Sequence, residues 1–167
     1  VLVIGAGAVG IGLAASMLSQ DARVSIYARG ETAKAISENG IRRCGLFTDY
    51  SFSSDELCVY SNYDDIAKNS FDYVFITSKT TANDDISEKL NLHRDILKDD
   101  FKIIIFQNGF GNDEYYLKYF PKEQVFVARV ITGFTRPERH ISKVTVYTEP
   151  ILLGSLQHEN PNCLAEV

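Results

Sequence analysis

The sequence contains few cysteines, and none of them lies near another. Cys44, Cys58 and Cys163 are the 3 cysteines among 167 residues, and no Cys-x-x-Cys pair or Cys/His cluster occurs. This spacing indicates neither a disulfide framework nor a zinc site, so we expect no metal. Isolated reduced thiols are typical of cytosolic proteins, and we expect a cytoplasmic location.

Membrane-spanning runs, targeting signals and two common catalytic motifs are also missing. No apolar run approaches the ~18 residues of a membrane span, and no secretory leader precedes the first predicted strand. A P-loop is excluded because no Gly-Lys-Ser/Thr follows the glycine-rich turn, and the sequence has no Gly-x-Ser-x-Gly elbow. With 17 basic and 22 acidic residues the net charge is −5, so we expect no nucleic-acid or membrane partner.

The composition is that of an ordinary globular protein, with 45% hydrophobic and 23% charged residues. A chain of 167 residues is long enough for one domain or slightly more, and it needs no disulfide to stabilise its core. The chain opens directly on an apolar run, and a polar stretch over 157–162 follows its last predicted strand. Both ends are typical of a piece of a longer protein.

Strand and helix signals alternate along most of the chain. Short β-rich runs predict strands over residues 1–4, 23–28, 72–77, 101–106, 124–130, 140–147 and 151–153. Apolar residues at helical spacing predict helices over residues 8–20, 31–39, 63–69, 83–98 and 112–120. Such alternation with short connections predicts an α/β fold of the Rossmann type, doubly wound around a mainly parallel sheet.

Residues 41–60 interrupt this alternation, because they are rich in Phe, Tyr, Ser and Thr and show no helical period. We predict two or three short strands there, as a meander on the edge of the sheet, and hence a small antiparallel extension. His93 is predicted to pack on the inner face of the helix over 83–98. Asn112 is predicted to cap the helix that runs to Phe120.

The first predicted strand is followed by a Gly-x-Gly-x-x-Gly turn that opens an amphipathic helix. In this setting Gly5 allows a tight turn, Gly7 lets the backbone approach a diphosphate, and Gly10 lets the helix pack closely on the sheet. The helix N-terminus adds unpaired N–H groups and a partial positive charge. A turn that binds nothing is the alternative. The candidate cofactor-binding residues are Gly5, Ala6, Gly7, Ala8, Val9 and Gly10.

The residue after the second predicted strand indicates which dinucleotide binds. NAD-specific sites carry a carboxylate there, which holds the ribose 2′-hydroxyl. Here the position carries Arg29, whose guanidinium can pair with the 2′-phosphate of NADP(H). Glu31 is the counter-signal, because a two-residue shift in register would place its carboxylate near the ribose. The sequence therefore favours NADP(H), and a solvated loop charge is the alternative for Arg29.

Two further polar residues follow buried strands, at the sheet edge where ligands of a doubly wound fold bind. Lys79 follows the strand over 72–77, and its point charge can bind carboxylate or phosphate oxygens. Asn108 follows the strand over 101–106 and can bond the nicotinamide ribose or a substrate oxygen. The alternatives are an exposed loop lysine and a purely structural Asn-Gly turn.

Taken together, these features resemble the N-terminal domain of the ketopantoate reductase (2-dehydropantoate 2-reductase) family, over nearly all of the chain. The lysine and the Asn-Gly-x-Gly turn are more specific for this family than the glycine-rich turn. The segments that carry the resemblance are Gly5–Gly10, Tyr27–Gly30 with Glu38–Ile41, Thr77–Lys79, Gln107–Gly111 and Ile151–Gly154.

The resemblance implies an NADP-dependent oxidoreductase that reduces a small 2-oxo acid, 2-dehydropantoate, to pantoate on the route to pantothenate and coenzyme A. It implies that Gly5–Gly10 bind the diphosphate and that Arg29 binds the 2′-phosphate. Lys79 would contact both cofactor and substrate, and Asn108 would lie at their junction, so both are orienting catalytic residues. Ile131–Phe134 would also line the cofactor.

The resemblance also implies a helical C-terminal domain that supplies a proton-donating lysine, a glutamate and polar side chains for the substrate. We therefore expect an NAD(P)-binding domain over 1–155 and the start of a linker over 156–167. This chain alone should bind NADP(H) but turn over little or nothing, because the second domain would impose the reacting geometry. A homodimer through the C-terminal domain is one option for the oligomeric state.

Two alternatives stay open. The substrate could be another 2-oxo or β-hydroxy acid, because family members often have more glycine and threonine where this chain has Ala128–Ile131. A non-catalytic dinucleotide sensor is the second alternative. Such sensors usually carry an acidic residue where this chain has Arg29, and they have no reason to keep Lys79 together with Asn108.

Overall fold

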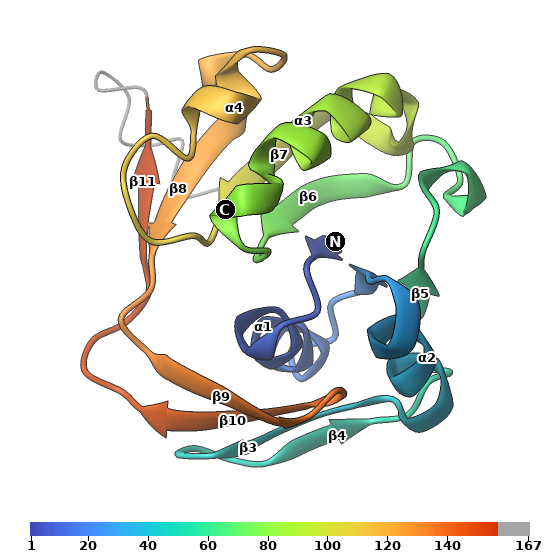
Figure 1. The fold of residues 1–167 in the computed structure, drawn as a ribbon, viewed down its shortest axis with the longest axis vertical. Helices are drawn as coiled ribbons and strands as arrows, with labels where there is room; N and C mark the ends of the chain where they lie inside the picture. Colours follow the sequence, from blue (N-terminus) through green and yellow to red (C-terminus); the bar gives the residue numbers. More distant parts are fainter. Residues whose placement is uncertain (157–167) are drawn as a thin grey trace.

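The computed structural model describes residues 1–156, which form two sheets with helix α1 (Ala8–Leu18) between them (Figure 1). The main sheet has seven strands in the order β11-β8-β7-β6-β1-β2-β5. All neighbours run parallel except β11, which is antiparallel to β8. The predicted α/β, Rossmann-type fold is therefore confirmed. The strands are β1 (Leu2–Ile4), β2 (Ser25–Tyr27), β5 (Cys58–Tyr60), β6 (Phe71–Ile76), β7 (Leu97–Ile105), β8 (Val125–Arg129) and β11 (Leu152–Ser155).

Helices cover both faces of the main sheet (Figure 1). Helix α1 and helix α2 (Gly30–Asn39) contribute to the core on one face, whereas α3 (Asn83–Leu92) and α4 (Glu114–Leu117) contribute to the core on the other. Gly40 ends α2 with a φ of 70°, a left-handed conformation that glycine adopts without strain.

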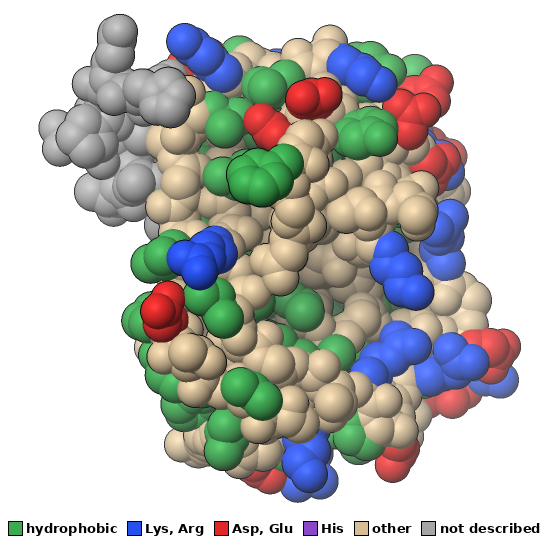
Figure 2. Space-filling view, turned by 60° about the vertical axis from the view of Figure 1, so that its left-hand side comes forward, with side chains coloured by type: hydrophobic (Ala, Val, Ile, Leu, Met, Phe, Trp, Pro, Cys, Tyr) green, Lys and Arg blue, Asp and Glu red, His purple; other side chains and the backbone are tan. Residues whose placement is uncertain are grey.

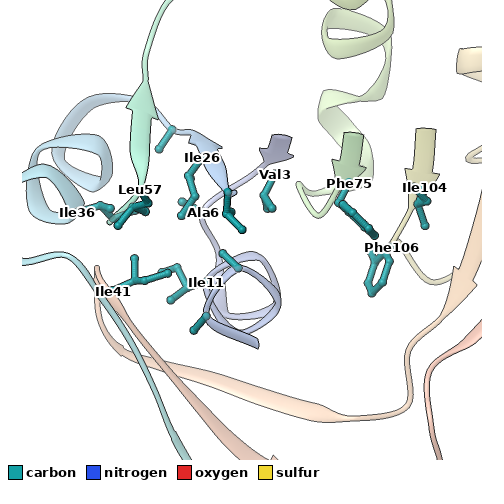
Figure 3. Close-up of a cluster of buried hydrophobic side chains, with 14 of the residues drawn as sticks. Val3, Ala6, Ile11, Ile26, Ile36, Ile41, Leu57, Phe75, Ile104 and Phe106 are labelled. Atoms are coloured by element: carbon teal, nitrogen blue, oxygen red, sulfur yellow. The ribbon is translucent and has the colours of Figure 1, made fainter. Parts of the chain in front are cut away.

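Strand β1, an inner strand of the main sheet, divides its side chains between the two cores. Val3 packs with Ile11 and Ile26 on the face that α1 covers (Figure 3). Leu2 and Ile4 pack in the second cluster, on the face that α3 and α4 cover. Side chains alternate along a strand, so a strand buried on both faces needs the uninterrupted apolar run that this sequence has.

A second sheet has four strands in the order β4-β3-β10-β9 and packs on the outer side of α1. Its strands are β3 (Ile41–Gly45), β4 (Tyr50–Phe52), β9 (Gly133–Glu138) and β10 (Ile141–Val146). The predicted small antiparallel extension is present in this second sheet. Its predicted place as a meander on the edge of the main sheet is wrong, because β3 and β4 belong to the second sheet and only β5 joins the main one. Strand β3 instead pairs parallel with β10, a partner about a hundred residues away that no local pattern reveals.

The helix predicted over 83–98 is too long, because α3 ends at Leu92. A 3-10 turn over Arg94–Ile96 follows, and Leu97 begins β7, where it pairs with Phe71 of β6. Leu97 fits the apolar spacing of a helix and also that of a buried strand, and strand pairing decides between them. His93 therefore lies at the end of α3, where its ring stacks on the ring of Tyr63 with the centroids 5.3 Å apart.

Two further helix predictions are corrected. The helix predicted over 112–120 begins at Glu114 and ends at Leu117, and Asn112 does not cap it. The amide of Asn112 instead donates to the carbonyl oxygens of Asn108 and Gly109, at 3.2 and 3.4 Å. The segment 63–69 forms a single 3-10 turn over Tyr63–Asp65.

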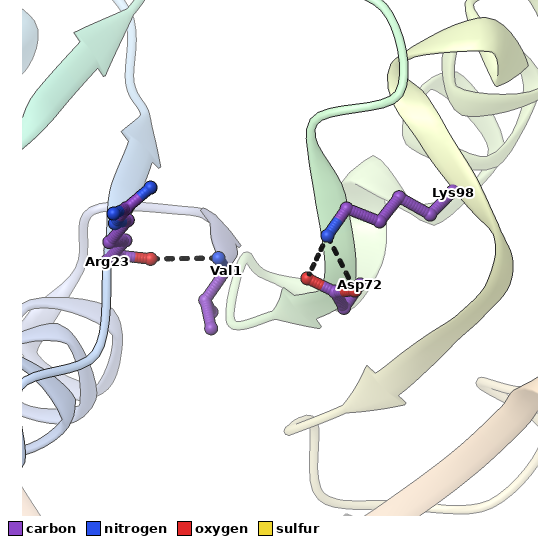
Figure 4. A network of polar contacts seen from close by, with 4 residues as sticks. All are labelled: Val1, Arg23, Asp72 and Lys98. Atoms are coloured by element: carbon purple, nitrogen blue, oxygen red, sulfur yellow. Dashed lines mark hydrogen bonds and ion pairs between the residues drawn. The ribbon is translucent and has the colours of Figure 1, made fainter.

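Polar contacts at the amino ends of the strands tie neighbouring strands together (Figure 4). The Val1 amino group donates to the carbonyl oxygen of Arg23 at 2.9 Å, and the Lys98 ammonium lies 2.8 Å from a carboxylate oxygen of Asp72. These contacts lie at the end of the sheet opposite to the carboxyl ends, where a ligand is expected. The predicted linker over 156–167 lies outside the described residues, apart from Leu156.

Candidate functional site

A cleft of about 460 Å³ opens at the carboxyl ends of β1, β2 and β6. The strand order reverses here, because the chain leads from β1 outward to β2 on one side and from β6 outward to β7 on the other. Such a reversal is where doubly wound sheets bind ligands. Figure 2 shows the hollowed face, with Lys and Arg side chains gathered at one side of the hollow. Its lining includes Gly5, Ala6, Gly7, Ala8, Arg29, Thr77, Ser78 and Lys79.

Close packing fixes the glycine-rich turn against the end of β6. Gly5 has a φ of 111°, and a Cβ there would lie 2.5 Å from the amide nitrogen of Ser78. A Cβ on Gly10 would collide with the carbonyl oxygen of Gly5. That same oxygen accepts a hydrogen bond from Thr77 Oγ1 at 2.6 Å. These two glycines are therefore required for the turn itself.

Gly7 differs from its neighbours, because a Cβ there would meet nothing within 4 Å among the described residues. Its φ of −82° is ordinary, so neither backbone conformation nor packing requires glycine at this position. The open space lies in the cleft, at the N-cap of α1. A phosphate group could approach the backbone here and meet the unpaired N–H groups of the helix. The turn therefore fits the diphosphate of a dinucleotide.

Arg29 lies at the rim of the same cleft, as the N-cap residue of α2. Its side chain is exposed, and Glu31 is not among the residues that line the described cleft. Tyr27 and Tyr63 stack with ring centroids 4.3 Å apart and form part of the wall. Burial raises the pKa of the Tyr63 hydroxyl.

Lys79 follows β6 and lines the cleft with its side chain exposed. Within residues 1–156 it forms no ion pair, whereas Lys89 in the same cleft pairs with Asp85 at 2.6 Å. The ammonium of Lys79 is therefore available to an anionic ligand.

Asn108 lies in a second hollow of about 670 Å³ at the carboxyl ends of β7 and β8. Its Nδ2 donates to the carbonyl oxygen of Val130 at 3.0 Å, and the amide N–H of Val130 donates to its Oδ1 at 3.3 Å. In the described part of the chain the two hollows share no lining residue. The structure thus brings Gly5–Ala8, Arg29 and Lys79 together, and it places Asn108 beside that group rather than within it.

The remaining predicted residues lie near the cleft but do not line it. Val9 faces an apolar hollow between α1 and the second sheet, which also receives Thr132 and Phe134. Ile131 lines the hollow of Asn108. The segment 131–134 therefore borders two hollows and does not line the cleft of the glycine-rich turn.

A buried amide network, which the sequence pattern does not indicate, connects the two hollows. Gln107 Nε2 donates to the carbonyl oxygen of Ser78 at 2.9 Å and to Asn83 Oδ1 at 2.7 Å. Asn83 Nδ2 donates to Asn112 Oδ1 at 3.2 Å, and the Tyr116 hydroxyl donates to Asn83 Oδ1 at 3.3 Å. The network fixes the segment before Lys79 relative to the turn that holds Asn108.

A family model described as ketopantoate reductase PanE/ApbA matches residues 1–158. The chain belongs to the ketopantoate reductase family. No curated protein matches the sequence. Among solved structures, 2-dehydropantoate 2-reductase from Geobacter metallireducens GS-15 matches with a TM-score of 0.82 and 22% identity, over 99% of this chain and 53% of that chain. The enzyme of that name from Methylococcus capsulatus matches with a TM-score of 0.77 and 24% identity, over 93% of this chain and 48% of that chain.

Other oxidoreductases share the fold of this ketopantoate reductase family domain. A D-mandelate dehydrogenase in complex with NADH and anilino(oxo)acetate matches with a TM-score of 0.75 and 18% identity, over 99% of this chain and 51% of that chain. The chain thus spans about half the length of the structures it matches. At such identities these structures show a shared fold, whereas the family assignment rests on the sequence match over residues 1–158.

Residues 1–156 of this family domain contain no candidate metal site, disulfide or membrane-spanning helix. No group of His, Cys, Asp and Glu side chains there could hold a metal ion. Cys44 and Cys58 are free thiols, and Cys163 lies outside the described residues. Within residues 1–156, none of the helices is both long and apolar enough to cross a membrane.

Proposed function

We propose that the protein reduces 2-dehydropantoate to pantoate with NADPH, on the route to pantothenate and coenzyme A, and that this chain is its cofactor-binding domain. The observation that carries the proposal is the placement of Arg29 in the same cleft as the open backbone at Gly7. The family match supports the substrate. We also propose a cytoplasmic location, as expected for this biosynthetic step.

The cleft offers separate groups for the two anionic parts of NADPH. The N-terminal end of α1 presents backbone N–H groups and a partial positive charge to the diphosphate. Arg29 lines the same cleft as this turn and pairs with the 2′-phosphate through hydrogen bonds that contribute roughly 1.5–3 kcal/mol each. NADH lacks the 2′-phosphate, so this contribution gives the domain its preference for NADPH.

Lys79 and Asn108 orient the reacting groups in this proposal. When bound, NADPH supplies a hydride to the ketone carbon of the 2-oxo acid. The Lys79 ammonium attracts the negatively charged oxygens of the substrate. Asn108 keeps one N–H and one oxygen lone pair beyond its two bonds to Val130, and these can hold the nicotinamide ribose or the substrate.

The C-terminal half of the full protein completes the site. The chain covers about half of its structural relatives, and we propose that the missing half supplies the proton-donating lysine and the remaining substrate contacts. This domain alone then binds NADPH without measurable turnover. A homodimer through that missing half is compatible with the proposal, and gel filtration of the full protein tests it.

The test is a titration of the chain with NADPH and NADH, followed by the emission of the reduced nicotinamide. The chain contains 0 tryptophans, so no tryptophan emission overlaps the nicotinamide signal. We expect NADPH to bind at least about tenfold more tightly, which is about 1.4 kcal/mol, and Arg29→Ala to remove this preference. Arg23→Ala is the matched control, because this exposed arginine lies at the opposite end of β2.

Two other results would redirect the proposal. Equal or tighter binding of NADH would favour an NAD(H)-dependent 2-oxo acid dehydrogenase or a dinucleotide sensor, and it would show that Arg29 does not select the cofactor. Binding of neither dinucleotide would exclude the cofactor-binding role. If NADPH is preferred, turnover of 2-dehydropantoate by the full-length protein tests the substrate.

A further inference from the structure

We propose that Arg136 is a cationic ligand for the diphosphate of the dinucleotide, which the second sheet adds to the backbone N–H groups of the glycine-rich turn. The inference rests on the proposed function, because it requires the cleft to hold a dinucleotide. Arg136 lies 130 residues from the turn in the sequence, on strand β9, which the sequence pattern does not predict.

Arg136 contacts the turn directly. Its Nη1 donates a hydrogen bond to the carbonyl oxygen of Ala6 at 2.9 Å, and the side chain lines the same cleft as Gly7 and Ala8. Within residues 1–156 no carboxylate pairs with Arg136. A guanidinium has five N–H donors, so several of them remain for a ligand. Their planar, forked arrangement matches the oxygens of a phosphate group.

The hairpin of β9 and β10 fixes the position from which Arg136 reaches the turn. Ser142 of β10 is fully buried, and its hydroxyl donates to the carbonyl oxygen of Ala8 at 2.6 Å. A Cβ on Gly12 would lie 2.8 Å from the ring of Phe134 and 2.8 Å from Ser142 Oγ. The hairpin is therefore packed directly on the first turns of α1. Such contact holds the backbone of β9 beside the turn, and the exposed side chain of Arg136 reaches Ala6 from there.

The electrostatics around Arg136 favour an anion. The guanidinium lies beside the N-terminal end of α1, whose partial positive charge repels a cation. The first turn of α1, all within the described residues, carries no acidic side chain to offset this repulsion. Arg29 and Lys79 add further positive charge to the cleft, and its acidic residue Asp85 already pairs with Lys89. Negatively charged phosphates bound at the turn would remove the repulsion.

Arg136 and Arg29 then recognise different parts of the dinucleotide. The 2′-phosphate, which we assign to Arg29, is present in NADPH and absent from NADH. The diphosphate is common to both, so loss of the Arg136 charge weakens both by the same factor. ADP carries a diphosphate without nicotinamide, and its affinity should fall as well.

The experiment compares Arg136→Met, which removes the charge at similar length, with Arg136→Lys, which keeps it. NADPH and NADH binding are followed by nicotinamide emission, and ADP binding by displacement of NADPH. We expect Arg136→Met to weaken all three ligands by roughly tenfold or more, the loss of one charge-assisted hydrogen bond. Arg136→Lys keeps the charge without the fork and should lose clearly less affinity than Arg136→Met, and the salt dependence of NADPH binding should become shallower only in Arg136→Met.

Arg139→Met is the matched control, because this exposed arginine lies at the turn of the same hairpin and outside the lining of the described cleft. If the wild type binds NADPH, three outcomes would overturn the inference. Arg136→Met could bind all three ligands with unchanged affinity, it could lose affinity for NADPH alone, or Arg136→Lys could lose as much affinity as Arg136→Met. A wild type that binds neither dinucleotide refutes the proposed function, and the inference falls with it. Thermal melting of each variant identifies any loss that comes from unfolding.

Discussion

Replacing Asn83 with alanine should destabilise the domain far more than a typical asparagine-to-alanine change. Asn83 is fully buried and joins three side chains, since it accepts from Gln107 and Tyr116 and donates to Asn112. Gln107 keeps its bond to the carbonyl oxygen of Ser78 when Asn83 is removed. The Tyr116 hydroxyl and Asn112 Oδ1 lose this partner, and both groups are buried.

The expected loss in the free energy of unfolding follows from these two groups, which are left without this hydrogen-bond partner. A buried polar group without a partner costs about 1–3 kcal/mol, so two of them bracket the loss at about 2–6 kcal/mol. Burial raises the pKa of Tyr116, so its hydroxyl stays protonated and keeps an O–H donor that needs a partner. We expect a loss of about 3 kcal/mol, a large share of the roughly 5–15 kcal/mol that stabilises a domain. Tm should fall by roughly 6–12 °C.

Urea unfolding followed by circular dichroism measures this loss. Asn91→Ala is the control, because Asn91 lies on the same helix, is only half-buried and has no side-chain hydrogen bond within the described residues. The double variant Asn83→Ala/Asn112→Ala should lose less than the sum of the single variants, because both remove the same bond. A loss below about 1 kcal/mol in Asn83→Ala, the net value of one ordinary hydrogen bond, would refute the reasoning.

Two further predictions concern the glycine-rich turn and the acid sensitivity of the fold. Gly7→Ala should leave Tm unchanged, because the new Cβ meets open space, but it should weaken NADPH binding. Gly10→Ala should lower both Tm and the affinity for NADPH. A Gly7→Ala variant that binds NADPH normally would contradict this prediction. The Lys98 ammonium lowers the pKa of Asp72 below its usual 3.8. This ion pair therefore stabilises the fold above about pH 4, and the stabilisation is lost as the pH falls through the lowered pKa of Asp72. Asp72→Asn should therefore be less stable at pH 7 and should lose less stability between pH 5 and pH 2 in urea titrations; an unchanged acid profile would exclude this role.

The sequence is informative where structure depends on neighbours along the chain. Gly5 and Gly10 are required by contacts within a single strand–turn–helix unit, so their spacing predicts the turn. The place of Arg29 is predictable for the same reason, since it follows the next strand of that unit. Leu97 is ambiguous, because a buried helix and a buried strand share its apolar spacing, and pairing with Phe71 decides the outcome.

Contacts between distant segments explain what the sequence does not reveal. Arg136 reaches Ala6 only because β9 and β10 fold over α1, and no local signal marks that approach. Asn108 was predictable as a polar residue after a strand, yet its bonds to Val130 depend on how β7 and β8 end side by side. The amide network around Asn83 likewise joins α3 to α4 and to the loop between β7 and α4.

The placement of α1 between two sheets has a consequence for the order in which the domain matures during synthesis. The main sheet can begin to form around β1, β2 and β6 early, but the outer side of α1 is covered by β10, which ends at Val146. Until that hairpin leaves the ribosome, apolar side chains of α1 stay in contact with water and the glycine-rich turn has no Arg136 beside it. Helix α1 is thus translated before the strands that cover it and reaches its final surroundings late, and we expect a nascent chain that stops before β9 to bind chaperones rather than a dinucleotide.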